Sequence, residues 1–196
     1  MTILQTISGR YVDLADMRPA DVKIEDISHA LSMLCRFNGH CREFYSVAQH
    51  SVLVSHILRD EGHAPAVQLA GLLHDAHEAY TGDVTHPMKQ FAWRMWRGSD
   101  LVSVHSSLSV FQDEIKMVIE EALAPNLCAQ FSDAHEYVKA ADLRALATER
   151  RDLMTEQALV WPVLEGIEPA GMEIVPIGPS LAYSIFVSRF RKLAAA

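Results

Sequence analysis

The feature that most constrains the fold is the spacing of apolar residues, which recur every three to four positions along most of the chain. Ile24, Ile27, Leu31 and Leu34 follow this period, for example. Such spacing places apolar side chains on one face of an α-helix, whereas a half-buried strand alternates every second residue. The chain is therefore predicted to be all-α, and its length suits a single domain over residues 1–196.

Glycine, proline and asparagine residues divide this helical pattern into segments. Residues 3–17 lack the helical period, and two short extended pieces around Ser8-Gly9 predict a small hairpin. Helices are predicted at residues 24–37, 44–59, 66–80, 110–124, 132–158 and 180–193, about five of them forming the core. The connections are predicted as a helix end at Asn38-Gly39, a loop at 82–87, a flexible loop or lid at 98–109, and an irregular stretch at 161–179 with a short strand at 172–175.

The charge balance argues against a protein that wraps nucleic acid. The chain has 17 basic and 25 acidic residues, so it offers no extended positive surface. A few converging Arg and Lys side chains can still hold a small anion. Trp93, Arg94, Trp96 and Arg97 form a basic-aromatic patch of a kind that binds single strands. We interpret it as core and rim, and expect no stable nucleic-acid binding.

The cysteines and the N-terminus indicate a cytoplasm-like compartment. Cys35, Cys41 and Cys128 are odd in number and form no CxxC pair, which argues against a disulfide scaffold. The N-terminus lacks the basic and apolar regions of a signal peptide. No apolar stretch approaches the roughly 20 residues that span a bilayer. We expect a cytoplasmic protein without a membrane partner.

The segment Leu72-Leu73-His74-Asp75-Ala76-His77-Glu78 carries the sharpest chemical signal. On a helix, His74 and Asp75 share a neighbourhood with Glu78, four and three positions later. Burying such groups is costly unless a charge compensates them, and a divalent cation does so directly. The alternative is a polar helix end facing solvent, and the His-Asp pair alone does not decide between the two.

Two further residues favour a metal site. His50 lies on the apolar side of the preceding predicted helix, 24 residues before His74. Asp142 lies inside a later predicted helix among small apolar residues, where an aspartate usually needs a function or an exposed position. Histidine and carboxylate side chains from three helices are a common way for a helical protein to bind a metal in its core.

The order of a histidine, a His-Asp pair and a distant aspartate resembles the HD superfamily of metal-dependent phosphohydrolases. The wider resemblance is carried by Arg36-Phe37-Asn38-Gly39-His40, Tyr45-Ser46-Val47-Ala48-Gln49-His50-Ser51, His74-Asp75-Ala76-His77-Glu78-Ala79-Tyr80-Thr81-Gly82-Asp83 and Pro87-Met88-Lys89. These sequences are similar to the branch of bacterial 5′-deoxynucleotidases and phage dATP triphosphohydrolases of 2-aminoadenine genomes. The resemblance covers about residues 10–150 and implies an HD-domain helical bundle around one metal site.

The resemblance also implies the ligands of that site. His50, His74, Asp75 and Asp142 would bind one divalent transition metal. Imidazole and carboxylate ligands suit cobalt, zinc, manganese and iron(II) alike. A second ion, such as magnesium, would accompany the substrate phosphates.

Catalytic and substrate-binding roles follow from the same resemblance. Glu78 corresponds to the carboxylate that orients or deprotonates the attacking water, and Asp83 to a second carboxylate near the sugar or the leaving side of the phosphate. Arg36 and Lys89 correspond to groups that bind the substrate phosphate. Phe37 stands where these enzymes often have tryptophan, so it either contacts the base or deoxyribose or closes a helix as a core aromatic.

The implied reaction is hydrolysis of a small-molecule deoxynucleotide at its 5′-phosphate. A triphosphohydrolase would convert dATP to deoxyadenosine and triphosphate, whereas a 5′-deoxynucleotidase would release orthophosphate from a monophosphate. We favour the first, because the phage enzymes have a similar compact size. The resemblance further implies a homo-oligomer, and a viral protein would act in the host cytoplasm.

Alternative interpretations concern single residues and whole classes. His77 is either a substrate contact or a partly exposed helix residue. A zinc peptidase would need HExxH or HxxEH, and residues 74–78 read HxxHE. A non-catalytic HD-like sensor or nucleotide-binding module is less favoured, because the ligands and Glu78 occur together. Charges further along are predicted to pair on a solvated helix face: Arg144, Arg150 and Arg151 with Glu149, Asp152 and Glu156.

Overall fold

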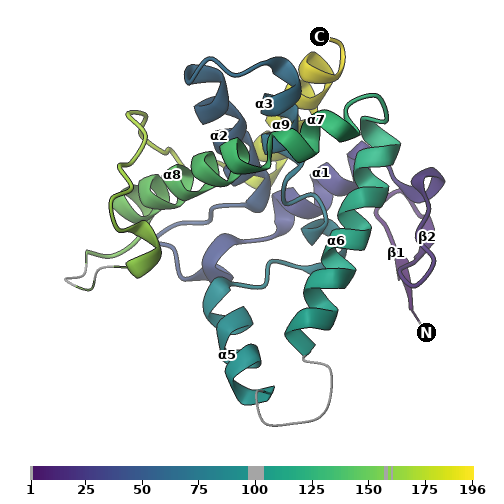
Figure 1. Ribbon diagram of the computed structural model, residues 1–196, viewed down its shortest axis with the longest axis horizontal. Helices are drawn as coiled ribbons and strands as arrows, with labels where there is room; N and C mark the ends of the chain where they lie inside the picture. The colour runs from purple at the N-terminus through teal and green to yellow at the C-terminus, as the bar shows by residue number, and fades with distance from the viewer. Residues whose placement is uncertain (1, 97–103, 157–158, 160) are drawn as a thin grey trace.

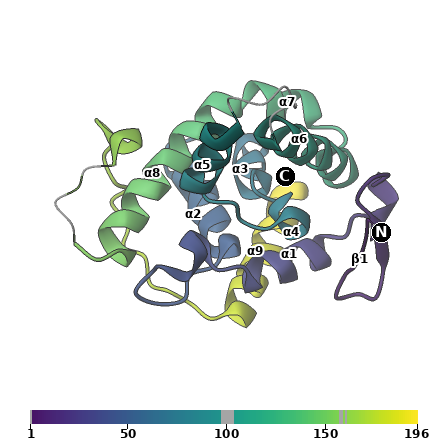
Figure 2. The ribbon, with the colours of Figure 1, turned by 90° about the horizontal axis from the view of Figure 1, so that it is seen from below.

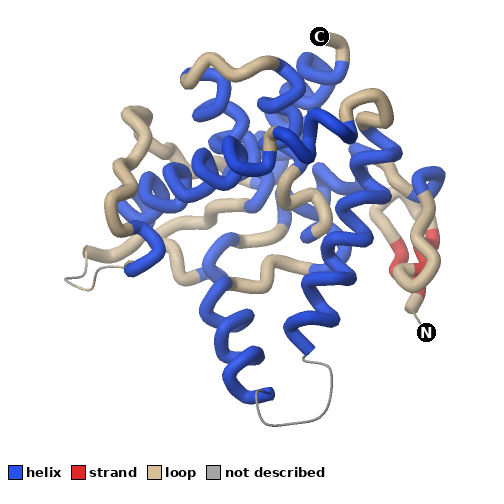
Figure 3. Tube along the Cα trace, in the orientation of Figure 1, coloured by secondary structure: helices blue, strands red, loops and turns tan. Residues whose placement is uncertain are grey.

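The computed structural model describes residues 2–96, 104–156, 159 and 161–196. Over this part of the chain the protein is mostly helical, with a small antiparallel hairpin at its N-terminus (Figures 1 and 3). The predicted helical class with an N-terminal hairpin is thereby confirmed. Among the described residues, no helix has both the length and the apolar character needed to cross a membrane.

The hairpin is fastened to the first helix. Strands β1 (Ile3–Gln5) and β2 (Tyr11–Asp13) pair antiparallel. In the turn between them, Ser8 donates its backbone N–H and its hydroxyl to the buried carboxylate of Asp26, at 2.9 and 2.8 Å. Asp26 belongs to α1 (Ile24–Met33). The hairpin therefore lies at the edge of the helical body (Figure 2).

The core forms where helices pack around α2, which contacts α1, α3, α8 and α9. The bounds of these helices are α2 (Val47–Asp60), α3 (Pro65–Leu73), α8 (His135–Leu153) and α9 (Pro179–Ala194). The facing sides bury apolar side chains such as Ile27, Leu31, Leu58, Leu72 and Phe186. Gly71 permits a close approach of α3 to α2, because a Cβ at this position would lie 2.4 Å from Cδ1 of Leu58.

The other elements surround this core or extend from it. Their bounds are α4 (Glu78–Thr81), α5 (His86–Trp96), α6 (Val104–Leu123) and α7 (Cys128–Asp133), with 3₁₀ turns at Pro19–Asp21, Arg36–Gly39 and Pro162–Leu164. α5 and α6 pack against each other, and α5 with the beginning of α6 projects from the rest of the protein (Figure 1). Further along α6, Ile115 and Ile119 are buried in the core.

The prediction of one helix over residues 24–37 is wrong in its last four residues. α1 ends at Met33, and the next residues become extended because Cys35 pairs with Ser46 in an isolated β-bridge. Phe37 and Asn38 then adopt left-handed backbone angles, with φ of 55° and 51°. Asn38 and Gly39 do adopt left-handed backbone angles, as predicted for a helix end. They belong, however, to the separate turn Arg36–Gly39 and do not cap α1.

Three other helix boundaries also differ from the predictions. The predicted helix 66–80 is two helices, because α3 ends at Leu73 and α4 begins at Glu78. Residues 104–109, predicted as part of a loop or lid, begin α6, while residues 98–103 lie outside the described residues. The predicted helix 132–158 is instead α7 followed by α8, which ends at Leu153.

The predicted strand at residues 172–175 is absent from this described segment, which is irregular. Side chains of α8 bind its backbone directly. The N–H of Ile174 donates to Oδ2 of Asp152 at 2.9 Å, and the carbonyl of Met172 accepts from Arg151 at 2.7 Å. Because these backbone groups are already paired, the segment needs no partner strand.

Candidate metal centre

His50 lies in the first turn of α2 and is completely buried. The helix begins at a favourable cap, since the hydroxyl of Ser46 accepts a hydrogen bond from the N–H of Gln49. The Nδ1 atom of His50 lies 2.6 Å from Oε1 of Glu149. A carboxylate at this distance accepts the hydrogen of Nδ1, so the neutral imidazole has its lone pair on Nε2, on the other side of the ring.

His74 follows the last residue of α3 and is held by that helix. Its Nδ1 lies 2.8 Å from the carbonyl oxygen of Gly71. A carbonyl oxygen can only accept, so Nδ1 carries the hydrogen and Nε2 presents a lone pair. The two histidines therefore offer their Nε2 atoms as metal ligands, and these atoms lie 3.4 Å apart.

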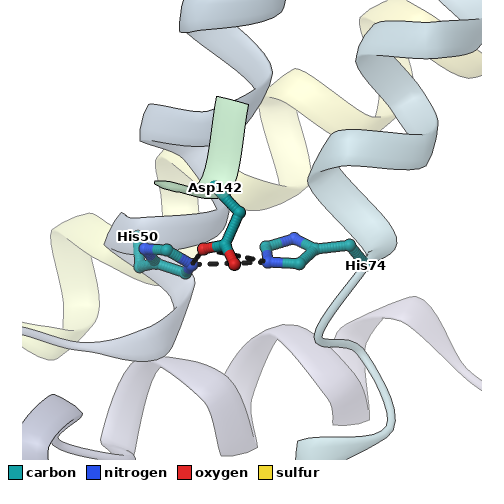
Figure 4. Close-up of side chains that lie close together, drawn as sticks. All are labelled: His50, His74 and Asp142. Carbon is teal, nitrogen blue, oxygen red and sulfur yellow. Dashed lines mark hydrogen bonds and ion pairs between the residues drawn. The ribbon is translucent and has the colours of Figure 1, made fainter. Parts of the chain in front are cut away.

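Two aspartates complete the cluster (Figure 4 draws the two histidines with Asp142). Oδ1 of Asp142 lies 3.2 Å from Nε2 of His50 and 3.9 Å from Nε2 of His74. Oδ2 of Asp75 lies 3.5 Å and 3.1 Å from the same two nitrogens. The side chain of Asp142 is 41% exposed, so solvent reaches the cluster on its side.

The chemistry and spacing of these atoms fit a metal ion. His50, His74 and Asp142 offer ligand atoms that all lie within 4.8 Å of one another, and this group could hold a metal ion. Ligands about 2.1 Å from a shared ion lie about 3.0–3.5 Å apart, close to the separations seen here. Two imidazole Nε2 atoms that face each other beside two carboxylates need a positive charge. In the metal-free protein Glu149 and Asp142 raise the pKa of His50 to about 10 against the effect of burial and of Arg36, so a proton supplies this charge. A cation would supply it once the ligands release that proton.

Arg36 lies beside this group on the turn after α1. Its side chain is 12% exposed, with one guanidinium nitrogen 3.0 Å from Oε2 of Glu149 and the other 4.0 Å from Oδ2 of Asp75. Glu149 and Asp75 hold the pKa of Arg36 above its usual value despite the opposing effect of burial. The predicted phosphate-binding arginine thus lies against the predicted metal ligands.

Glu149 is the residue that the sequence analysis misplaced. It was predicted to pair with nearby arginines on a solvated face, but it is completely buried and contacts His50 and Arg36. Arg144 pairs instead with Glu61, whereas Arg151 pairs with Asp152 as predicted. The spacing in the sequence could have indicated its true position. Glu149 lies seven residues after Asp142, so it is two helical turns further along the same face of the helix.

Glu78 and Asp83 lie on the α4 side of the cluster. Glu78 is 5% exposed, and its Oε2 has no hydrogen-bond partner among the described residues. Burial, together with Asp75 and Asp83, raises the pKa of Glu78 to about 9. Burial also raises the pKa of the half-buried Asp83, against the effect of Arg36. Both carboxyl groups therefore interact electrostatically with the cluster.

His77 and Lys89 lie on the same side as Glu78. Burial lowers the pKa of His77 to about 4, so the imidazole is neutral near pH 7. Its Nδ1 is buried without a hydrogen-bond partner among the described residues. Lys89, on α5, is half-buried and close enough to influence the pKa of both His77 and Asp83.

Phe37 packs its ring against the guanidinium of Arg36. The guanidinium carbon of Arg36 is 5.3 Å from the centre of its ring, and the ring of Trp161 lies 6.2 Å beyond. Arg150 stacks over Trp161 at 5.4 Å. Trp161 had no predicted role, and the four residues form a continuous row in which two aromatic rings lie between two arginines. Of the predicted basic-aromatic patch, the side chains of Trp93 and Trp96 and all of Arg97 lie outside the described residues.

Fold and site together define a helical protein with a buried histidine–aspartate group that can hold a metal ion. No protein-family model matches the sequence. The chain is 36% identical over 197 residues to the uncharacterized protein YfdR of Escherichia coli, in an alignment covering 99% of this chain and 97% of YfdR. It therefore belongs to the YfdR family. An uncharacterized protein of Rhodobacter capsulatus is 44% identical over 87 residues, 42% of this chain and 44% of that protein.

Proposed function

We propose that this protein is an HD-domain phosphohydrolase that cleaves a deoxynucleotide at its 5′-phosphate. The observation that carries the proposal is the convergence of His50, His74, Asp75 and Asp142 in one buried group. Two neighbours of this group support the proposal: the guanidinium of Arg36, which could bind a phosphate, and Oε2 of Glu78, which has no hydrogen-bond partner among the described residues.

Each neighbouring residue has a chemical task in this proposal. A divalent ion bound by the four ligands would supply Lewis-acid polarisation of the phosphoryl group. Arg36 neutralises charge on the phosphoryl oxygens, and Lys89 does so as a point charge from α5. Glu78 accepts a proton from the attacking water. In the metal-free protein the raised pKa keeps the carboxyl of Glu78 protonated near pH 7. A cation bound beside it would favour the carboxylate that this task requires.

The proposed substrate is dATP, with deoxyadenosine and triphosphate as products. This choice rests on the similarity to the phage triphosphohydrolases. The row of Arg36, Phe37 and Trp161 supports a nucleotide in general, because an aromatic surface next to a phosphate-binding arginine suits a base attached to a phosphate.

The test is a substrate survey. Purified protein with cobalt or manganese is incubated with each deoxynucleoside mono- and triphosphate, and the products are separated by chromatography. We expect triphosphate and deoxyadenosine from dATP. Orthophosphate from monophosphates alone would assign a 5′-deoxynucleotidase instead. Absence of product from every nucleotide, with the metal retained, would refute the proposal and favour a binding module.

A further inference from the structure

Glu149 joins two groups that have separate tasks in the proposed reaction. It lies in α8 and is completely buried, so its carboxylate is not solvated and depends on its protein contacts. Oε1 lies 2.6 Å from Nδ1 of His50, and Oε2 lies 3.0 Å from a guanidinium nitrogen of Arg36. Each carboxylate oxygen therefore binds a different partner.

The contact with His50 fixes the side of the imidazole that faces the cluster. Because Oε1 can only accept, the hydrogen of His50 resides on Nδ1 and the lone pair resides on Nε2. Nε2 is the atom that lies 3.2 Å from Asp142 and 3.4 Å from His74. Without an acceptor at Nδ1, the hydrogen could move to Nε2, where it would block ligation.

The contact with Arg36 fixes the guanidinium next to the same cluster. An arginine that is 12% exposed needs a compensating charge, and Glu149 is nearer to it than Asp75. α8 also carries Asp142, and the fully buried Ala145 lies between Asp142 and Glu149 on this helix, which packs against α2.

We propose that Glu149 is a positioning residue, whose single carboxylate orients His50 toward the metal and holds Arg36 beside it. The role toward His50 requires only the metal site, whereas the role toward Arg36 rests on the proposed function. Groups that bind the outer nitrogen of a metal-ligating histidine commonly raise metal affinity by about 10–100-fold.

The test compares the cobalt affinity of Glu149→Gln with that of the wild-type protein. Each protein is first depleted of metal and then titrated with cobalt, and binding is measured by the visible absorption of the bound cobalt. Glutamine keeps the size but loses the negative charge and one acceptor oxygen. Its remaining oxygen is a weaker acceptor for Nδ1 of His50 even when it faces that atom. We expect the affinity to fall by about 10–100-fold, with a changed cobalt spectrum. Glu136→Gln, an exposed carboxylate on the same helix, is the matched control and should leave both unchanged. Equal affinity of Glu149→Gln and wild type would overturn the proposal.

A second measurement needs no variant and applies even if Glu149→Gln does not fold. In wild-type protein loaded with zinc, nitrogen-15 NMR of the histidine rings locates the hydrogen on each imidazole. We expect it on Nδ1 of His50. A hydrogen on Nε2, or zinc bound through Nδ1, would contradict the role assigned to Glu149.

Kinetics separates this inference from the proposed function. If the wild type hydrolyses nucleotides, Glu149→Gln should raise KM as well as weaken cobalt binding, because Arg36 loses its support. If the wild type hydrolyses none of them, the proposed function fails, and cobalt affinity still decides the role of Glu149.

Discussion

Oδ2 of Asp75 lies 3.1 Å from Nε2 of His74, the residue that precedes it in the chain. Successive side chains in a regular helix point about 100° apart. His74 keeps helical backbone angles, with φ of −58° and ψ of −35°, although α3 ends at Leu73 and both residues lie in the turn 74–77. The two side chains therefore converge through their own conformations, in the turn that joins α3 to α4.

This arrangement predicts different effects for two neighbouring carboxylates. Asp75→Ala should abolish both metal retention and hydrolysis, because it removes a ligand. Glu78→Ala should retain the metal and lose turnover by about 10²–10⁴-fold, because it removes the proton acceptor. Metal content after gel filtration and initial rates with dATP measure the two effects. An unchanged rate in Glu78→Ala would mean that another group is the base.

The raised pKa of Glu78 predicts a pH-dependent stability in the metal-depleted protein. Its pKa is about 9 in the folded chain, against about 4.3 when unfolded. The folded state therefore holds a proton that the unfolded state releases, and stability falls as pH rises from about 5 to about 8. Glu78→Gln cannot ionise and lacks this dependence. The difference in free energy of unfolding between Glu78→Gln and the wild type should therefore shift by about 1–4 kcal/mol in favour of the variant between about pH 5 and about pH 8. Urea denaturation at both pH values measures it, and parallel curves would contradict the assignment.

Arg36→Ala should weaken both substrate binding and the fold. It leaves the buried carboxylate of Glu149 with Nδ1 of His50 as its hydrogen-bond partner among the described residues, and breaking a buried ion pair costs about 3–5 kcal/mol. KM should rise as well, because the phosphate loses a donor. Denaturation curves and KM are the readouts, with the exposed Arg59→Ala as control. Unchanged KM in folded protein would exclude a phosphate role for Arg36.

Phe37→Ala and Trp161→Ala should reduce discrimination among bases. Their rings form the aromatic surface beyond Arg36, and stacking on such a surface is worth about 1–3 kcal/mol per base. The kcat/KM values for the four deoxynucleoside triphosphates should therefore become more alike. Tyr11→Ala, an exposed aromatic on the hairpin, should leave the ratios unchanged. If Phe37→Ala and Trp161→Ala, like Tyr11→Ala, kept the wild-type ratios of kcat/KM among the four nucleotides, the base would bind elsewhere.

Gly71→Ala should destabilise the protein and loosen metal binding together. The added Cβ would lie 2.4 Å from Cδ1 of Leu58 and 3.4 Å from Cγ1 of Val54, so α2 and α3 must shift or Leu58 must change rotamer. Overpacking of this kind costs about 1–3 kcal/mol. Since α2 and α3 position His50 and His74, cobalt affinity should fall too. Gly171→Ala has open space around it and serves as the control in thermal denaturation.

Local pattern was sufficient for the class of fold and for much of the site. The period of apolar residues is a property of short segments, so it predicted the helices and failed mainly at their ends. The helix predicted to reach residue 37 ends at Met33, because the strand-like pairing of Cys35 with Ser46 depends on a second segment. Asp142 and His50 could be singled out because a polar residue among apolar neighbours is visible in the sequence itself.

Patterns within the amino-acid sequence were enough to predict a helical chain with histidines and aspartates at spacings typical of a metal site. Tertiary structure decided which distant groups meet them. Glu149 lies 99 positions from His50 and 113 from Arg36, and Trp161 reaches Phe37 from the irregular C-terminal segment. Such contacts arise from the packing of α8 and the C-terminal segment against the rest of the protein. A local charge pattern therefore placed Glu149 on the surface, although the folded chain buries it beside the metal ligands.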